Sequence, residues 1–351
     1  MPAARISMLR VFWLSSSLLF LLCRQVAAQT TSVIHHDPVV GDVHAYVYAV
    51  DFVDAQVPCT FDDMETVAQQ VATFYGSNSF GQLAVVTHVI QNPQSLDGHF
   101  KVDHPCSDLL TNTSRYDTEI WDDIKTSTGL DFYALSQTPN VKIIKEYSCF
   151  RGGSAGQGSP LAQVGRCWDA PLLVHEFGHT LGMAHASKNR PPGSHAKEYG
   201  DRADVMGKGT LDSGLNAPHR MQMGWIPASS IQTVVTDSEI TLTDLEYTPV
   251  DGTASNTTTV IRIPKTADLV DSPLFKDYYY ISLQSGRVKV HGVEVAPVDT
   301  EQNEVVFGNT LLMGNKTAIN GTFIDKSGRF SLTSLSTTLD DARITISGLG
   351  N

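Results

Sequence analysis

The segment His175-Glu176-Phe177-Gly178-His179-Thr180-Leu181-Gly182-Met183-Ala184-His185 organises the rest of this chain. On a helix, residues four apart lie on one face, so His175 and His179 can present two imidazole nitrogens to a single metal ion. Gly182 allows a left-handed residue that ends the helix, and the chain then turns back to bring His185 to the same ion. The spacing therefore predicts a metal site with three histidine ligands.

Three neutral histidines leave one tetrahedral position open for water, which distinguishes a catalytic zinc site from a closed structural one. Glu176 can reach that water but not the metal, so we assign it as the general base. The expected cofactor is one catalytic Zn²⁺. A histidine-rich buried helix without metal is the alternative, but it would desolvate three histidines and a glutamate without an evident set of partners.

The first 28 residues have the composition of a secretory signal peptide. Arg5 and Arg10 precede an apolar run from Val11 to Cys23, and Val26-Ala27-Ala28 suits cleavage after Ala28. The apolar run is too short to span a bilayer, and no later stretch is apolar enough to do so. We therefore expect a secreted, extracellular protein whose mature form has no membrane segment; an uncleaved anchor is the alternative.

The composition is acidic. Removing the predicted signal removes three arginines and no acid, which moves the formal net charge from −12 to −15. An acidic surface argues against nucleic acid and anionic membranes as partners. Four sequons fit a secretory route as glycosylation candidates, and their asparagines are Asn112, Asn256, Asn315 and Asn320.

Four cysteines remain after the predicted cleavage, namely Cys59, Cys106, Cys149 and Cys167. An even number in a secreted chain indicates two disulfides, with three possible pairings. We favour Cys149 with Cys167, because they bracket a glycine-rich loop, and Cys59 with Cys106 by elimination. The loop, residues 151–158, is either an edge segment that binds an extended peptide as an added strand or a flexible surface loop.

The residues before the histidine motif predict an α/β arrangement. Ala45 to Val53 is a β-branched and aromatic run typical of a buried strand. Thr60 and Asp63 form a capping box for a helix that we expect to end at Gly76. Further segments are expected as strands at 83–90 and 141–144 and as a short helix at 118–126. This order predicts a sheet packed behind the helix of the histidine motif.

The histidine helix has start and packing signals of its own. Asp169 is the expected N-cap, with Pro171 in the first turn. Its expected buried stripe consists of Val174, Phe177, Gly178 and Leu181. The histidines then fall towards the opposite face, into a cleft.

A second motif, Glu198-Tyr199-Gly200-Asp201-Arg202-Ala203-Asp204-Val205-Met206-Gly207, follows a proline-rich loop. We expect Met206 to lie in a tight turn and to form the floor of the metal site. A lone methionine is weak evidence, since methionine often fills core gaps. Asp201 and Asp204 suit either a Ca²⁺ ion or a capped turn, and nothing else in the sequence supports calcium.

These two motifs and a third, LNAPHRMQMGW at residues 215–225, together resemble the gametolysin family of metzincin metallopeptidases. The first motif is typical of metzincins in general, and the other two narrow the resemblance to the gametolysin family. It implies a metzincin-type catalytic domain and a secreted zinc endopeptidase, with protein or glycoprotein substrates outside the cell or in its wall. His219, in the third motif, either assists at the oxyanion or, as we favour, lies on a helix surface.

Two features depart from some members of that group. The chain enters its first strand soon after the signal, which leaves no room for a long propeptide. Lys208 and Gly209 follow Met206 where some metzincins carry a tyrosine, so we expect no tyrosine from that turn on the metal.

From residue 231 onward, short alternating runs predict an all-β domain, a β-sandwich of about 120 residues. The expected strands are 239–245, 258–263, 277–283, 288–295, 310–312, 329–332 and 342–346. Tyr278, Tyr279 and Tyr280 either form a substrate-facing surface or, as we favour, pack in the core on one face.

The predicted organisation is a signal peptide at 1–28, an N-terminal tail at 29–42, a metzincin-like zinc peptidase domain at 43–229 and a β-rich domain at 230–351. In the tail, His35-His36-Asp37 either touches the metal or, as we favour, is solvated.

Two rival functions remain open. In one, the protein is a catalytically silent zincin-fold adhesion or cell-wall-binding protein, which predicts that the glutamate or a ligand is lost; neither is lost here. In the other, a zinc hydrolase acts on non-peptide amides.

Overall fold

The computed structural model describes residues 38–109, 113–149, 152–166, 169–189, 196–246, 257–272, 274–294, 298–299, 304–305, 308–316 and 321–349. The predicted signal peptide, the His35-His36-Asp37 segment, Cys167, and the sequon residues Asn112, Asn256 and Asn320 lie outside these ranges; Asn315 lies in a strand. Among the described residues, no helix is both long and apolar enough to cross a membrane.

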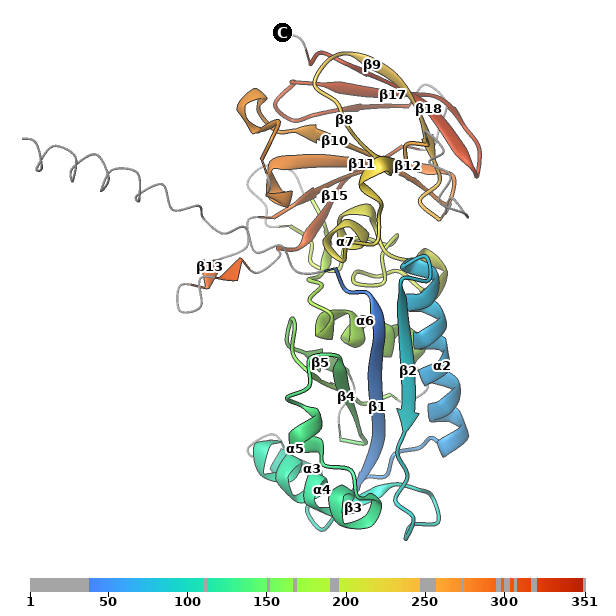
Figure 1. Cartoon of the computed structure of the whole chain (residues 1–351), viewed down its shortest axis with the longest axis vertical. Helices are drawn as coiled ribbons and strands as arrows, with labels where there is room; N and C mark the ends of the chain where they lie inside the picture. The colour runs from blue at the N-terminus through green and yellow to red at the C-terminus, as the bar shows by residue number, and fades with distance from the viewer. Residues whose placement is uncertain are drawn as a thin grey trace, which may run out of the picture. The chain divides into compact units, whose positions relative to one another are not determined.

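The first sheet has the order β2-β1-β4-β6-β5, with β3 also paired to β1 (Figure 1). Its strands are β1 (Gly41–Phe52), β2 (Leu83–Val89), β3 (Phe100–Val102), β4 (Val141–Tyr147), β5 (Gly153–Ala155) and β6 (Leu161–Val164). All of these pairs are parallel except β5 with β6. The antiparallel β5 ends the strand order, so one side of it is an edge.

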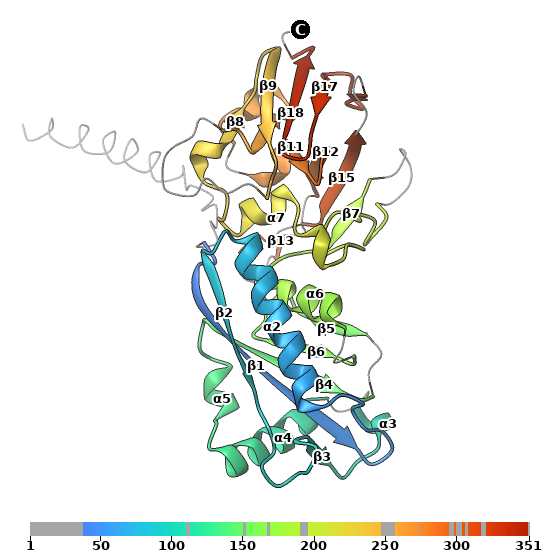
Figure 2. The ribbon, with the colours of Figure 1, turned by 90° about the vertical axis from the view of Figure 1, so that its right-hand side faces the viewer.

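Helices cover both faces of this sheet. The side chains of β1 alternate between the two faces, so each face carries a hydrophobic core of its own for helices to pack against. Val43, Ala45 and Val47 pack with α2 (Phe61–Asn78) and α6 (Ala170–Thr180). Tyr48 and Val50 pack with α4 (Thr113–Thr128) and α5 (Phe132–Leu135) on the other face, and α3 (Cys106–Leu109) precedes α4. Figure 2 shows α2 and α6 along the sheet. The predicted α/β arrangement behind α6 is confirmed.

Two predicted helix boundaries were wrong. Helix α2 has the predicted capping box at Thr60 and Asp63, but it runs through Gly76 and ends at Asn78. A glycine weakens a helix without ending it, and Val71, Phe74 and Tyr75 hold this last turn in the core. The segment predicted as a short helix at 118–126 is the 16-residue α4, which buries Tyr116, Ile120 and Ile124 against the sheet.

The predicted disulfide pairing was also wrong, because Cys106 bonds to Cys149. Strands β3 and β4 flank β1 in parallel register, with Phe100 and Tyr147 both opposite Val50. The two cysteines follow the carboxyl ends of these strands, which meet at one edge of the sheet. This proximity comes from strand order and not from spacing along the chain. Cys59 is disulfide-bonded as well, and its partner is not among the described residues.

The C-terminal half is β-rich, as predicted. One sheet has the order β7-β15-β12-β11-β10-β8, a second has the order β16-β17-β18-β9, and β13 (Val298–Asp299) pairs with β14 (Glu304–Val305). The first contains β7 (Ala186–Lys188), β8 (Ile231–Thr233), β10 (Val260–Pro264), β11 (Tyr278–Gln284), β12 (Arg287–Val293) and β15 (Thr310–Lys316). The second contains β9 (Ser238–Thr243), β16 (Thr322–Ile324), β17 (Ser331–Thr337) and β18 (Asp341–Ser347).

The two larger sheets share one hydrophobic core, in which Ile281 and Val290 of one meet Leu332 and Ile344 of the other. Each of the seven predicted strands overlaps an observed one. Tyr278 and Tyr280 are buried, and Tyr279 donates to Asp325, which confirms core packing for this run.

Short helical segments connect these sheets. Residues before and after the predicted boundary at position 229 are also in direct contact. The helical segments are η1 (Leu211–Ser213), α7 (Ala217–Gln222), η2 (Ala228–Ser230), η3 (Ala267–Leu269) and η4 (Phe275–Asp277). The chain from His36 onward forms one compact unit. Strand β7 pairs with β15, so a segment before the predicted boundary at 229 extends the C-terminal sheet.

Candidate metal centre

Helix α6 positions the first two histidines. Its N-cap is Asp169, whose carboxylate accepts from Leu172 N at 3.2 Å, and Pro171 lies in the first turn, as predicted. The predicted stripe of Val174, Phe177, Gly178 and Leu181 is buried. The helix ends at Thr180, and Gly182 adopts a left-handed φ of 102°. The chain then reverses and brings His185 back towards the helix.

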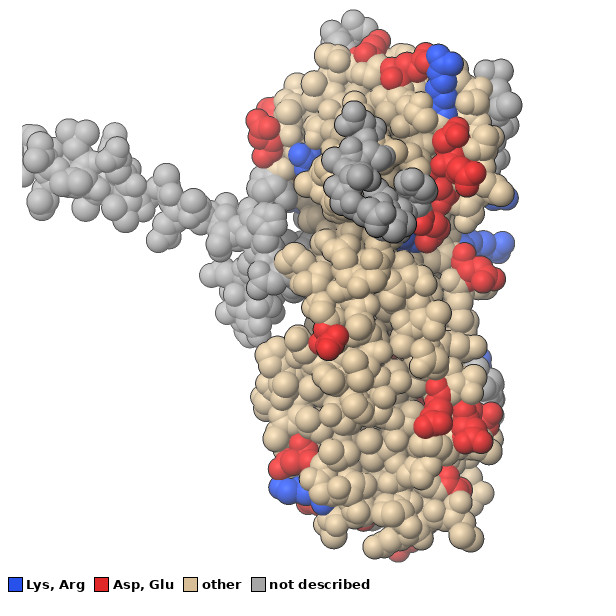
Figure 3. All heavy atoms as spheres, turned by 45° about the vertical axis from the view of Figure 1, so that its right-hand side comes forward, with Lys and Arg blue, Asp and Glu red and all other residues tan. Residues whose placement is uncertain are grey.

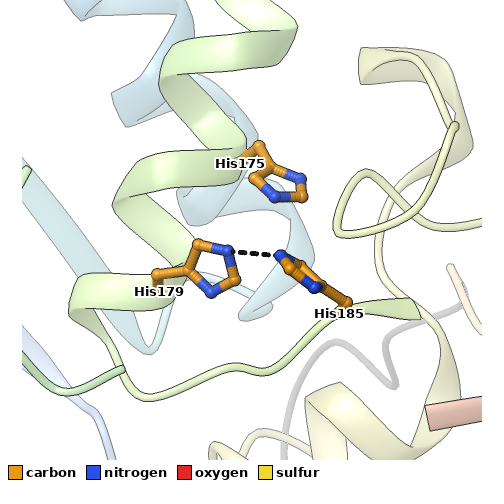
Figure 4. A group of neighbouring side chains, drawn as sticks. All are labelled: His175, His179 and His185. Carbon is orange, nitrogen blue, oxygen red and sulfur yellow. Dashed lines mark hydrogen bonds between the residues drawn. The ribbon is translucent and has the colours of Figure 1, made fainter. Parts of the chain in front are cut away.

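The three histidines lie together as predicted (Figure 4). One nitrogen from each of His175, His179 and His185 lies within 4.8 Å of the others. His175 and His179 are buried, and His185 is half-buried, immediately before β7. The cluster is therefore accessible from the side of His185.

Each imidazole is oriented through its Nδ1 atom, which faces an acceptor oxygen. These contacts are His175 Nδ1 with Val205 O at 2.9 Å, His179 Nδ1 with Met183 O at 2.8 Å, and His185 Nδ1 with Glu198 Oε1 at 2.7 Å. An acceptor at Nδ1 fixes the proton there and leaves Nε2 as the atom that binds a metal. All three rings are thus in the tautomer that a metal site needs.

The Nε2 atoms of His179 and His185 are 3.1 Å apart. Because both rings carry their proton at Nδ1, the lone pairs of the two Nε2 atoms face each other and repel. A cation bound between these atoms would attract both. Burial lowers the pKa of His175, and it lowers the pKa of His179 to about 4, which keeps both rings neutral. Three imidazole nitrogens within 4.8 Å of one another are a donor set that suits Zn²⁺.

Glu176 is buried beside the cluster. Its Oε2 atom has no hydrogen-bond partner within the described part of the chain, and burial raises its pKa to about 7. A carboxyl group with a pKa near neutrality can accept and release a proton under physiological conditions. Gly153 of β5 lies against this carboxylate, because a Cβ at position 153 would overlap Glu176 Oε1.

Met206 is fully buried and packs against α6, and its role as the floor of the metal site stays a prediction. A Cβ on Gly178 would collide with Met206 Sδ, so this glycine lets the turn pack against the helix. Asp204 Oδ1 accepts from Met206 N at 2.7 Å, and Asp204 Oδ2 accepts from His219 Nδ1 at 2.7 Å. His219 is fully buried in this pair, so the favoured position on a helix surface was wrong. Its contact with Asp204 ties α7 to the turn that contains Met206.

Asp201 and Asp204 each pair with a buried histidine. Asp201 Oδ1 accepts from Ala203 N, and its Oδ2 faces His291 Nε2 of β12 at 3.0 Å, with both side chains fully buried. These contacts favour the capped turn over calcium. One other group with metal-ligand chemistry is found among the described residues, Asp51, Asp97 and His99, where His99 Nδ1 is 3.3 Å from both Asp51 oxygens.

Two residues of the second motif adjoin the site but had no role in the sequence analysis. Glu198 binds His185, as above, and Tyr199 packs its ring 4.1 Å from that of His185, between ring centroids. The turn that contains Met206 places no tyrosine at the site, but the earlier turn that contains Glu198 places Tyr199 there. Sequence spacing gave no indication of it, because residues 13 and 14 positions beyond a ligand have no fixed position relative to it.

The C-terminal half supports the third histidine of the cluster. Asn309 Oδ1 accepts from His185 N at 3.2 Å, and Thr310 N donates to His185 O at 3.0 Å. The same Asn309 donates through Nδ2 to Glu294 at 3.0 Å. Beyond His185, Ala186 pairs with Thr310 in register. The β-rich half is therefore part of the metal centre's support.

Comparison with known proteins agrees with this chemistry. Three oriented histidines and a buried glutamate are the set of groups that metal-dependent peptidases use. Residues 157–309 match the family described as gametolysin peptidase M11, which confirms the resemblance seen in the three motifs. The match begins between β5 and β6 and ends at Asn309, so it covers the three histidines and the residues that support them. No curated protein matches the chain.

Among solved structures, wild-type OgpA from Akkermansia muciniphila aligns at 12% identity and a TM-score of 0.29, over 90% of this chain and 97% of that chain. Catalytically inactive OgpA in complex with an O-glycopeptide substrate aligns at 10% identity and a TM-score of 0.28, over 88% and 91%. Scores this low carry no inference about fold or substrate.

Proposed function

We propose that this chain is a secreted zinc endopeptidase of the metzincin type, which hydrolyses internal peptide bonds of extracellular or cell-wall proteins and glycoproteins. The single observation that carries the proposal is the cluster of three imidazoles, each with an acceptor oxygen at Nδ1, two of them on the helix that carries the buried Glu176. The proposal of secretion rests on the apolar N-terminal run and the sequons. Acidic side chains are scattered over the face shown in Figure 3, which fits the expectation that nucleic acid is not a partner.

His175, His179 and His185 would hold the zinc ion through Nε2. When bound, zinc supplies a Lewis acid that polarises the scissile carbonyl and makes water acidic enough to deprotonate near neutral pH. Glu176 takes the proton from the attacking water as the carbon–oxygen bond forms. It then donates that proton to the leaving nitrogen as the carbon–nitrogen bond breaks. The pKa of about 7 suits both steps.

Strand β5 provides a place for an extended substrate. It pairs with β6 on one side, ends the strand order of its sheet, and carries Gly153 against Glu176. A peptide added to the free edge would pass the general base with its backbone hydrogen-bonded. Of the two interpretations of the glycine-rich loop, this geometry favours the peptide-binding edge.

Hydrolysis of casein or gelatin, with and without o-phenanthroline, tests the proposal. Glu176→Gln should lower the rate by about 10²–10⁴-fold and keep the metal, whereas the exposed Glu65→Gln should match wild type. Hydrolysis that survives both chelation and Glu176→Gln contradicts the mechanism. A protein that binds zinc and hydrolyses no peptide supports the silent adhesion protein, and one that cleaves only simple amides supports the other hydrolase.

A further inference from the structure

The turn from Lys197 to Gly200 projects both of its central side chains onto the metal centre. Gly200 N donates to Lys197 O at 2.9 Å, which closes the turn. Lys197 and Lys188 exchange two backbone hydrogen bonds, at 2.8 and 2.9 Å, so the turn is tied to the strand that follows His185. Close packing of Gly200 on Lys188 makes the attachment rigid, because a Cβ at position 200 would collide with it.

Tyr199 occupies an unfavourable backbone conformation in this turn, with a φ of 55°. A left-handed φ at the third residue of a turn is ordinarily taken by glycine or asparagine, and a bulky residue there is strained. Among the described residues, Phe80 and Ser285 are the other non-glycine residues with positive φ, and Tyr199 is the one of the three whose ring packs against histidines of the cluster. Strain of this kind concentrates at functional sites.

The aromatic ring of Tyr199 lies over two of the three ligands. Its centroid is 4.1 Å from that of His185 and 5.7 Å from that of His175. Burial raises the pKa of Tyr199, and the carboxylates of Glu198 and Glu176 raise it further, so the phenol lies within electrostatic reach of the general base. The side chain is half-buried and hence open to a bound substrate.

The hydroxyl of Tyr199 is uncommitted. No protein group within the described part of the chain bonds to it, whereas Tyr75 donates to Val174 O at 2.7 Å and Tyr279 donates to Asp325 at 2.8 Å. A tyrosine has an ordinary pKa of about 10 and is a hydrogen-bond donor at neutral pH. A donor that is fixed beside the ligands and has no internal partner is suited to a group that arrives with the substrate.

We propose that Tyr199 is a catalytic residue whose hydroxyl donates a hydrogen bond to the scissile carbonyl oxygen as negative charge develops there. This inference rests on the proposed peptidase function and adds a residue to it. No proton is transferred in the step. The donor strengthens its contact only as the oxygen gains charge, so it stabilises the transition state more than the bound substrate. Glu198, next to it, keeps His185 oriented.

Tyr199→Phe tests the proposal, because it removes the hydroxyl and keeps the ring. We expect kcat to fall by about 10²–10³-fold, the usual loss for one oxyanion donor, with KM, zinc affinity and unfolding temperature close to wild type. Binding of a phosphinic peptide, which has a tetrahedral centre, should weaken by a similar factor, and binding of a product peptide should not change. Tyr133→Phe is the matched control and should match wild type. The hydroxyl of Tyr133 donates to Thr118 O, far along the chain from the histidine motif.

A second variant, Tyr199→Asn, tests the strain independently of catalysis. Because asparagine tolerates a left-handed φ, the zinc-free variant should unfold at a temperature at least as high as the zinc-free wild type, although its zinc-loaded form should be as slow as Tyr199→Phe. A large fall in that temperature would mean that the ring is chiefly structural, against the proposal.

These experiments distinguish failure of the proposed peptidase function from failure of the role assigned to Tyr199. If the zinc-loaded wild type hydrolyses no peptide, the proposed function fails and Tyr199 fails with it. If wild type is active and Glu176→Gln is not, while Tyr199→Phe keeps full kcat and full affinity for the phosphinic peptide, only the role of Tyr199 is overturned. Loss of zinc affinity in Tyr199→Phe also overturns it, since the residue would then only support His185.

Discussion

Gly153, at the start of β5, lies so close to Glu176 that a Cβ at position 153 would overlap the carboxylate oxygen Oε1. The edge strand therefore packs directly against the proposed general base. This contact links the place where an extended substrate would bind to the group that would deprotonate water. No other residue type fits at position 153 without moving the carboxylate.

We expect Gly153→Ala to displace Glu176 and to lower kcat by about 10²-fold or more, since misplacement of a catalytic group by about 1 Å costs this much. Zinc content should be unchanged, because the Nδ1 partners of the histidines are not affected. Steady-state kinetics with metal analysis measures both. Gly76→Ala is the control, because a Cβ there has room, and it should leave kcat unchanged. Full activity in Gly153→Ala would show that Glu176 has another position available.

Removing the carboxylate of Glu198 should weaken metal binding. Its side chain is 60% exposed, so the pair with His185 adds little to stability, but it fixes the tautomer of the ligand. We expect Glu198→Ala to raise the dissociation constant for zinc by about 10–100-fold, as measured by competition with a chelator. Glu119→Ala removes a carboxylate from His104, which is not a ligand, and should have no effect. Equal zinc affinities for Glu198→Ala and wild type would remove Glu198 from the account.

The buried pair of Asp201 and His291 joins the second motif to the C-terminal sheet. Both side chains are fully buried, so His291→Ala leaves Asp201 Oδ2 in the core without its partner. We expect a loss of about 3–5 kcal/mol in the free energy of unfolding, measured with urea. His104→Ala, in the partly exposed pair with Glu119, should cost about 1 kcal/mol or less. A small effect of His291→Ala would indicate that the two halves unfold independently, in agreement with separate domains divided at residue 229.

Glu146 predicts a stability that depends on pH. This residue of β4 is 2% exposed, and burial, with the nearby Asp169 carboxylate, raises its pKa from 4.5 to about 8. Between these values the folded protein holds a proton that the unfolded chain has lost, so stability falls as pH rises. The contribution is up to about 1.4 kcal/mol per pH unit.

Urea unfolding at pH 5.5 and pH 8 measures this effect, and Glu146→Gln should remove the decline and be the more stable protein at pH 8. Glu65→Gln, on the exposed face of α2, should keep the wild-type dependence on pH. The same pH dependence in wild type and in Glu146→Gln would mean that Glu146 ionises normally in the folded state.

Local patterns predicted most of the site and much of the fold. The four-residue spacing of His175 and His179 and the left-handed Gly182 are properties of one short segment, so the cluster was predictable from the sequence. The capping box at Thr60 and the seven C-terminal strands depend on nearest neighbours in the same way.

Relations between distant segments were not predictable in this way. Cys106 meets Cys149 because β3 and β4 flank β1, and this strand order leaves no trace in the spacing of the cysteines. His219 has the sequence context of a surface helix, but its partner Asp204 lies in the preceding motif and draws it into the core. Asn309 supports His185 across 124 residues of chain, a distance at which no periodic pattern carries information.

The zinc content of the purified protein, measured by elemental analysis alongside peptide hydrolysis, tests the central claim most directly. The account predicts one zinc ion per chain in wild type and in Glu176→Gln, and less than one in His179→Ala. It also predicts hydrolysis by wild type that stops with o-phenanthroline and returns with added zinc. A wild-type protein without bound metal, in which added zinc produces no hydrolysis, would contradict the account.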